Sequence, residues 1–336
     1  MIRKLIASSL IAALMLALPG SSKVATAAET QFIRIATLAP RDSDLAKSFL
    51  KIDKGLRASS NNAWGVRLYP SGVAGDEVDV IRKMKVGQMD ASIITATGLS
   101  QIVREVSVLD SPGVINNYKQ LEAVQAAMSK EWEGSFEKSG FKLLAWGESG
   151  QYRWFAKNAM NRPSDLKNMR PWVWPANHVM KEIYHVIGAN GVPLGLPEVY
   201  GALQTNMADM VMATAVAVVS LQWHANLKHV TKRTMGVLLG AMIMNKDKWA
   251  TLPPDVAKLV QEEAKKGTEG DKDDMRKSDD RAYANLVKRG YTADEFTADG
   301  EKEYLTMADT VRKHLVGRIY PAELLDRVMK ITSAAK

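Results

Sequence analysis

The side chains best suited to metal binding or acid–base catalysis in this sequence are its five histidines, and their spacing favours neither. His224 and His229 lack the neighbouring acid of a zincin-type helix, and no other pair stands at a metal-ligand spacing. The chain has no Cys, no Gly-X-Ser-X-Gly elbow, no P-loop and no dinucleotide-binding fingerprint. We therefore predict no catalytic residue, no metal site and no cofactor, and expect structural roles for every histidine: His178, His185, His224, His229 and His314.

A second group of side chains is suited to holding an apolar small molecule. Trp172 and Trp174 stand two residues apart, Met210 and Met212 alternate in an apolar segment, and Trp223 follows a stretch rich in Ala and Val. Aromatic rings offer a large apolar contact area, and the flexible thioether of Met fits an irregular ligand. The competing interpretation of each residue is ordinary core packing, which is common for such side chains.

Fewer residues are candidates for binding a polar end of the ligand than for lining an apolar pocket. Thr37, Thr95 and Thr97 stand where predicted strands end, and ligands of open α/β sheets collect at the carboxyl ends of strands. Arg153 lies at the apparent crossing between two halves of the chain. Its guanidinium could bind a ligand carboxylate as a fork, or it could form an ion pair at the surface or between lobes.

The elements that must position these residues alternate between strand and helix. Five segments have the pattern of strands: residues 32–38, 66–69, 91–95, 141–146 and 210–212. Helices are predicted after Asp42 and Asp76, over 118–140 and 175–187, and through most of the region from Pro254 to Lys330. This alternation is typical of an α/β fold with a largely parallel sheet.

The first 28 residues have the composition of a secretory signal peptide. Arg3 and Lys4 supply positive charge, the segment from Leu5 to Leu18 is apolar, and the segment ending at Ala28 supplies small residues for cleavage. No segment has the length and character of a membrane-spanning helix. With no Cys for lipid attachment, we expect a soluble periplasmic protein from which residues 1–28 are removed.

Charge and length limit the class of partner. The formal net charge of +8 falls to +5 once the three basic residues of the signal peptide are removed, and acids are interleaved with bases along the rest. Without Lys/Arg runs beside stacking aromatics, nucleic acid is not expected as a partner. About 300 remaining residues are more typical of two lobes than of one core.

A set of short segments, in a fixed order, covers nearly the whole mature chain: Gly72–Glu77, Val86–Asp90, Pro163–Lys167, Pro197–Thr205, Met207–Asp209, Asn245–Trp249 and Leu252–Pro254. Gly72 and Gly75 suit a turn with positive φ, and Asp90 and Asp209 precede apolar strands, where a carboxylate accepts backbone N–H bonds. Together the segments resemble the substrate-binding proteins of tripartite ATP-independent periplasmic (TRAP) transporters.

The resemblance implies an α/β, two-lobed periplasmic-binding-protein fold with a ligand cleft between the lobes and a helical C-terminal region. It implies a binding protein rather than an enzyme, with membrane-embedded transporter subunits as partner. We expect the first lobe over 29–152, the second over 153–240, and a return segment with C-terminal helices packing on both lobes over 241–336. A monomer is expected.

The departures from the family pattern bear on the ligand. The family carries a carboxylate-binding arginine after the Asp-Leu-Lys segment, but here that position is Trp172, and the nearest arginine, Arg170, stands two residues earlier. The polar residues common after Asp209 are replaced by Val211, Met212 and Ala213. The expected cleft has lost its charge anchor and gained an apolar lining.

We therefore predict a TRAP-type solute-binding protein for a small, neutral or largely apolar ligand. The predicted ligand-binding residues are Trp172, Arg153, Trp174, Met210, Met212, Thr37, Thr95, Thr97 and Trp223. Two alternatives remain open. The protein could be an organic-acid receptor in which Arg153 replaces the missing arginine, or a ligand-loaded sensor or carrier that serves a membrane receptor without a TRAP permease.

Overall fold

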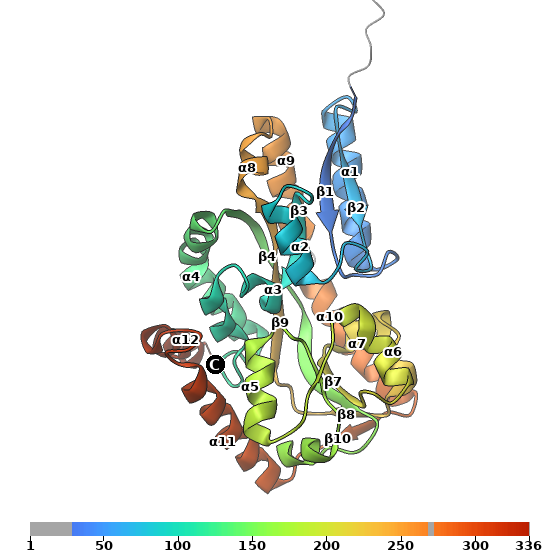
Figure 1. Ribbon diagram of the computed structural model, residues 1–336, viewed down its shortest axis with the longest axis vertical. Helices are drawn as coiled ribbons and strands as arrows, with labels where there is room; N and C mark the ends of the chain where they lie inside the picture. The colour runs from blue at the N-terminus through green and yellow to red at the C-terminus, as the bar shows by residue number, and fades with distance from the viewer. Residues whose placement is uncertain (1–28, 268–271, 336) are drawn as a thin grey trace, which may run out of the picture.

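The structure is a computed structural model that describes residues 29–267 and 272–335, so the predicted signal peptide lies outside the described residues. The chain forms two lobes, which we call upper and lower as they stand in Figure 1. The α/β, two-lobed fold class is thereby confirmed. None of the helices in the described ranges has the length and apolar character needed to cross a membrane.

The upper lobe is built on parallel strands with helices around them. Strand β1 pairs in parallel with both of its neighbours, β2 and β3. The strands are β1 (Gln31–Ala36), β2 (Trp64–Tyr69) and β3 (Ala91–Thr95). The helices are α1 (Asp44–Ser59), α2 (Glu77–Lys85), α3 (Ala96–Leu99), α8 (Lys246–Ala250) and α9 (Pro254–Lys265).

Two long strands, β4 (Phe141–Ala156) and β9 (Gly236–Asn245), run antiparallel to each other through both lobes (Figure 1). In the upper lobe β9 also pairs with β3, and in the lower lobe β4 also pairs with β7 and β8. The resulting strand order is β10-β8-β4-β9-β3-β1-β2, with β7 alongside β4. Because β4 and β9 pair antiparallel with all these neighbours, the prediction of a largely parallel sheet is wrong for the middle of the sheet.

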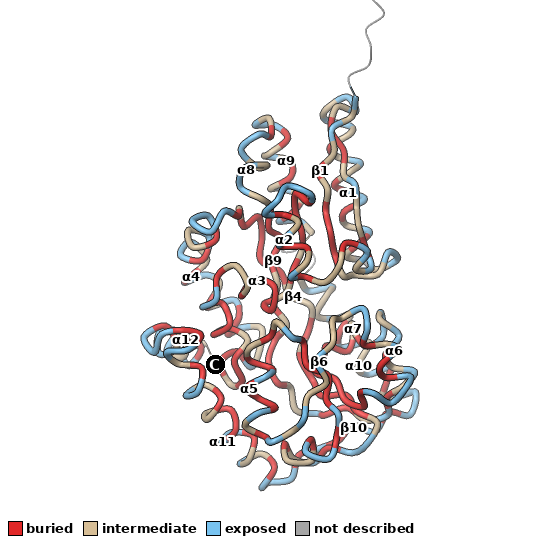
Figure 2. The backbone as a smooth tube through the Cα atoms, viewed as in Figure 1, coloured by how far each residue is buried: buried red, intermediate tan, exposed pale blue. Residues whose placement is uncertain are grey.

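The lower lobe contains short strands and covering helices. Its strands are β5 (Trp172–Val173), β6 (Val192–Pro193), β7 (Met210–Ala213), β8 (His229–Thr231) and β10 (Thr292–Asp294). Its helices are α5 (His178–Ile187), α6 (Val199–Gln204), α7 (Ala215–Ser220) and α11 (Ala298–Leu315), with short 3-10 turns at Pro163–Asn168, Leu196–Glu198 and Trp223–Asn226. Buried residues follow the central strands, and exposed ones gather on the outer helices and loops (Figure 2).

Three further helices flank the junction between the lobes. They are α4 (Tyr118–Lys138), α10 (Lys272–Lys288) and α12 (Ala322–Ala334). Helix α4 matches the predicted helix 118–140, and its buried apolar residues recur at three- and four-residue spacing, as that prediction requires. A 3-10 turn, η1 (Arg104–Asp110), leads from α3 toward α4.

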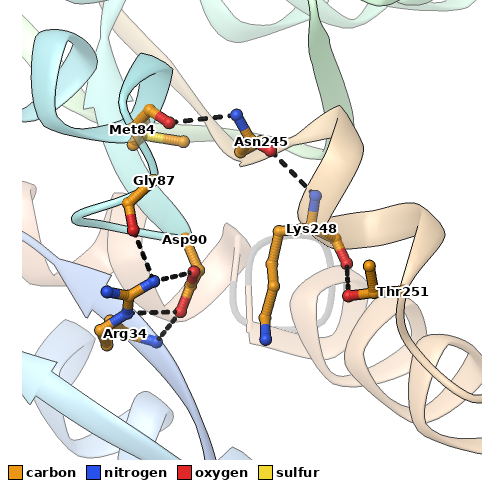
Figure 3. A network of polar contacts seen from close by, with 7 residues as sticks. All are labelled: Arg34, Met84, Gly87, Asp90, Asn245, Lys248 and Thr251. Atoms are coloured by element: carbon orange, nitrogen blue, oxygen red, sulfur yellow. Dashed lines mark hydrogen bonds and ion pairs between the residues drawn. The ribbon is translucent and has the colours of Figure 1, made fainter.

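One polar network fixes β1 to the start of β3 in the upper lobe (Figure 3). The carboxylate of Asp90 accepts the backbone N–H of Arg34 at 2.7 Å and its guanidinium at 2.9 and 2.7 Å. Nearby, Asn245 caps α8 by accepting the N–H of Lys248, and it donates to Met84 O at 3.0 Å. The prediction that Asp90 accepts backbone N–H bonds is confirmed.

Candidate functional site

Within the described residues, side-chain hydrogen bonds join the two lobes in front of the central strands. Trp174 Nε1 donates to Asp76 Oδ2 at 2.7 Å, and Asn177 Nδ2 donates to Thr97 Oγ1 at 2.8 Å. Gln101 Nε2 donates to the carbonyl of Ala176 at 3.0 Å. The upper-lobe partners stand at the start of α2 and just after β3, and the lower-lobe partners stand between β5 and α5. We call this region the inter-lobe site: Asp76, Glu77, Thr95, Thr97, Asp110, Trp172, Trp174 and Asn177.

The local sequence explains why Asp76 reaches the other lobe. Asp76 is the N-cap of α2, and its side chain accepts the N–H of Glu77 at 2.8 Å. The side chain of Asp79 in turn accepts the backbone N–H of Asp76. Gly75 immediately before it has φ +96, and a Cβ there would lie 2.7 Å from that of Asp79. Gly72 has φ +70, so the predicted positive φ is confirmed at both Gly72 and Gly75.

Glu77 is buried beneath the ends of the upper-lobe strands. Its carboxylate accepts Thr95 N at 2.8 Å, Thr95 Oγ1 at 2.9 Å and Gly98 N at 2.9 Å. None of these partners is a cation. Burial therefore raises the pKa of Glu77 to about 7, although the hydrogen bonds act in the opposite direction.

Asn177 joins Thr97 to a second buried acid. Its Oδ1 accepts the N–H of Met180 at 2.7 Å and so caps α5, while its Nδ2 donates to both Thr97 Oγ1 and Asp110 Oδ2, the latter at 3.1 Å. Burial raises the pKa of Asp110 to about 6 against the effect of the Asn177 bond. The sequence analysis did not select Glu77, Asp110 or Asn177, although the N-cap position of Asn177 was a usable signal.

The three predicted tryptophans lie together. The ring centroid of Trp172 is 5.7 Å from that of Trp174 and 5.6 Å from that of Trp223. Trp172 donates its indole N–H to Leu194 O at 2.8 Å, and all three rings are buried. The structure thus forms an aromatic cluster at the inter-lobe site, with Trp174 making the contact to Asp76.

The two predicted methionines have different surroundings on β7. Met210 is fully buried, with its sulfur 3.8 Å from the hydroxyl of Tyr184 on α5. Met212 stands opposite Trp154 of β4 and lines a small interior cavity together with Asp110. Of the two, Met212 is therefore the one that the structure brings close to the inter-lobe site.

The predicted threonines take mainly structural contacts. Thr37 is buried after β1, where its Oγ1 accepts the N–H of Ala39 at 3.1 Å. Thr95 binds Glu77, and Thr97 binds Asn177, as described above. Thr95 and Thr97 consequently belong to the inter-lobe site, whereas Thr37 shapes the loop beside it.

Arg153 and Arg170, the two arginines named in the sequence analysis, have hydrogen-bond partners within the lower lobe. Arg153 donates to the carbonyls of Thr231, at 3.3 Å, and Lys232, and its guanidinium stacks 4.2 Å from the centre of the Tyr283 ring. Its Nε has no hydrogen-bond partner among the described residues. Arg170 is paired with Asp209.

Comparisons with known proteins agree with this architecture. Residues 35–317 match the family model DctP, described as bacterial extracellular solute-binding protein, family 7. A C4-dicarboxylate-binding periplasmic protein of Rhodobacter capsulatus is 24% identical over 323 residues, which cover 95% of this chain and 96% of that protein.

Two solved structures share the fold. The sugar acid binding protein of Advenella mimigardefordensis, in complex with galactonate, gives a TM-score of 0.84 at 16% identity and covers 92% of this chain and 100% of that one. A TRAP periplasmic solute-binding protein of Xanthobacter autotrophicus with bound β-D-galacturonate gives 0.80 at 18% identity, with coverage of 90% and 99%.

Proposed function

Because the chain belongs to family 7 of the bacterial extracellular solute-binding proteins, we propose that it closes its lobes on a small neutral or largely apolar ligand and delivers that ligand to a membrane-embedded transporter. Proteins of this periplasmic family are receptors rather than enzymes, and this chain is a TRAP-type solute-binding protein. We further propose that it acts as a monomer, with the lobes divided near residues 152 and 240.

The observation that carries the choice of ligand is that the described residues place no arginine in the inter-lobe site. Trp172 stands at the position of the family arginine, while Arg153 and Arg170 are held by partners in the lower lobe. The ionisable residues of the inter-lobe site, Asp76, Glu77 and Asp110, are all acids. A buried ligand carboxylate would keep its desolvation cost without a cationic partner, which favours a ligand lacking that group.

Closure of the lobes supplies the mechanism. A ligand held between them stabilises the closed arrangement to the extent that it binds this arrangement more tightly than the open one. We assign the bending point to β4 and β9, whose pairing register shifts between Glu148 and Gln151. There, buried Asp279 of α10 accepts the N–H of Gln151 at 3.0 Å and that of Val216 at 3.0 Å, so it connects the strand to the lower lobe.

The experiment is native mass spectrometry of the purified protein, followed by a thermal-shift screen of small carboxylates against neutral aromatic and aliphatic compounds. A true ligand raises the melting temperature with its concentration, because it binds only the folded state. We expect neutral compounds to give the larger shifts. A uniform preference for C4 to C6 acids would contradict the proposal.

A competing function is an organic-acid receptor that uses Arg153. Two observations support it. The Nε of Arg153 has no partner in the described part of the chain, and the Xanthobacter and Advenella structures hold sugar acids. Acid-induced thermal shifts that disappear in Arg153→Ala and persist in Trp172→Phe would favour this function. An uptake assay in cells lacking the gene tests whether the receptor serves a permease.

A further inference from the structure

A small interior cavity of about 10 Å³ lies in the lower lobe, next to the inter-lobe site. Its wall includes Asp110 of η1, Tyr152 and Trp154 of β4, Met212 of β7 and Tyr304 of α11. A volume of this size holds a single oxygen atom with its hydrogens, about one water molecule. The cavity is therefore large enough for one small functional group and too small for a whole ligand.

Three residues on this wall carry buried polar atoms that have no hydrogen-bond partner among the described residues. They are Asp110 Oδ1, Trp154 Nε1 and the hydroxyl of Tyr304. Trp154 is 1% exposed and Tyr304 is 2% exposed, so bulk water does not reach these side chains. Buried polar atoms in folded proteins nearly always have partners, and three without one around the same cavity indicate that a polar group belongs there.

The three atoms specify the chemistry of that group. An indole N–H can only donate, an ionised carboxylate oxygen can only accept, and a phenol hydroxyl can do either. A carboxylate in the cavity could not donate to Asp110, and an ammonium could not accept from Trp154. A hydroxyl oxygen does both, as does a water molecule.

The cavity is connected to the contact between the lobes. The second oxygen of Asp110 accepts from Asn177, which also donates to Thr97 of the upper lobe. Asp110 therefore belongs both to the wall of the cavity and to the hydrogen-bonded contact between the lobes.

We propose that the cavity is a subsite for one hydroxyl group of the ligand, and that the ligand is a neutral alcohol rather than an acid or an amine. The hydroxyl donates to Asp110 Oδ1 and accepts from Trp154 Nε1–H, with Tyr304 as the third partner. This inference rests on the proposed function, and it narrows the neutral ligand to one chemical class. A water molecule would satisfy the same atoms, so the test must distinguish the two sources of the oxygen.

The test uses sets of compounds that share one carbon skeleton and end in a hydroxyl, carboxylate, ammonium or methyl group, beginning with benzyl alcohol, benzoate, benzylammonium and toluene. Affinities are measured by calorimetry on the full mature protein. We expect the hydroxyl member to bind about tenfold more tightly than its methyl counterpart, since one buried hydrogen bond is worth about that factor. Carboxylate and ammonium members should bind more weakly still.

Tyr304→Phe and Trp154→Phe each remove one unpartnered polar atom and keep an aromatic ring. Both should reduce the preference for hydroxyl over methyl, and Tyr304→Phe should do so without lowering the melting temperature. The matched control is Trp132→Phe. Trp132 is a buried residue of α4 whose Nε1 also has no partner among the residues that the structure describes, but it does not line the cavity. The Trp132→Phe variant should leave the preference for hydroxyl over methyl unchanged.

Two results would overturn the proposal while leaving the receptor function intact. If methyl members bind as tightly as hydroxyl members, the cavity holds a water and not the ligand. If carboxylate members bind most tightly, the ligand is an acid. If instead no member of any set binds, and a wider screen of neutral and acidic metabolites finds nothing, the proposed function itself fails together with the subsite.

Discussion

Asp209 accepts both the backbone N–H of Arg170, at 2.7 Å, and its Nε, at 3.0 Å. Asp90 and Arg34 make the same pair of contacts in the upper lobe, at 2.7 and 2.9 Å. In both lobes the arrangement fixes the aspartate that precedes an apolar strand. Arg170 is therefore part of the framework of the lower lobe.

The Asp209 contact leads to the first prediction. Asp209→Ala should lower the free energy of unfolding by about 2 kcal/mol, because it removes charge-assisted hydrogen bonds to a buried carboxylate. Asp90→Ala should have a similar effect in the upper lobe. Urea denaturation measures both, with Asp326→Ala on the exposed face of α12 as the control. Equal stability of the Asp209 and Asp326 variants would show that the contact is dispensable.

Glu77 gives the protein an unusual dependence on pH. Its folded-state pKa of about 7 exceeds the unfolded value of 4.5, so the folded state holds the extra proton between these pH values. The contribution of Glu77 to stability is complete below pH 4.5 and is lost as the pH rises toward and through 7, by about 3 kcal/mol in total. Asp110, with its pKa raised to about 6, acts in the same direction.

The measurement is the free energy of unfolding from pH 4 to pH 8 for the natural protein and Glu77→Gln. The difference between the two should change by up to about 3 kcal/mol in favour of the variant as the pH rises. A difference that does not vary with pH would mean that the Glu77 carboxyl titrates normally.

Variants of Arg153 and Trp172 should affect different properties: the first the stability of the fold, the second the affinity for the ligand. Arg153→Ala should destabilise the fold by about 1–3 kcal/mol, because it removes bonds to two carbonyls and the stacking on Tyr283, while ligand affinity stays unchanged. Trp172→Phe should weaken ligand binding by changing the aromatic cluster. Paired urea denaturation and calorimetry would reveal the reverse pattern if Arg153 held the ligand.

Trp174→Phe tests the contact between the lobes. It keeps an aromatic ring but removes the hydrogen bond to Asp76, so the closed arrangement should become less favourable and ligand affinity should fall about three- to tenfold. Small-angle scattering should show a larger radius of gyration for this variant without ligand. Trp249→Phe in α8, distant from the inter-lobe site, is the control and should match the natural protein in both measurements.

Gly150 tests the bending point in β4. Its φ is +102, and a Cβ at this position would overlap the carboxylate of Asp279. Gly140 has φ +86 with open space around it, so it supplies a matched control. We expect Gly150→Ala to cost about 2 kcal/mol more than Gly140→Ala in unfolding free energy. Equal losses of unfolding free energy in the two variants would show that the Asp279 side chain can move away from the added Cβ without strain.

The sequence predicted helices and capping contacts well where these depend on residues close together in the chain. The spacing of apolar residues in 118–138 identified α4, and the aspartates before β3 and β7 were correctly expected to accept backbone N–H bonds. The strand predicted over 141–146 continues in the structure to Ala156. Gly147 and Gly150 interrupt the alternation of apolar residues, as a loop would. In the structure Gly147 is paired with Gly240, and Gly150 lies where the strand register shifts.

The site was less predictable because its contacts join distant parts of the chain. The sequence selected Trp172, Trp174 and Trp223, which do lie together, but it gave no sign that Trp174 would reach Asp76, 98 residues away. Asp110 is the last residue of a 3-10 turn of mixed composition and belongs to no motif. Its importance follows from burial beside Asn177, a property of tertiary structure alone.

The return of β9 to the upper lobe sets the order in which the chain can fold. Strand β3 acquires its antiparallel neighbour only when residues 236–245 are present, after strands β5 to β8 and helices α5 to α7 of the lower lobe have been made. A chain that folds from its N-terminus therefore keeps one edge of the first sheet unpaired until β9 is available. Such long-range pairing slows folding and exposes an edge to aggregation, so we expect assembly to depend on periplasmic chaperones that shield that edge.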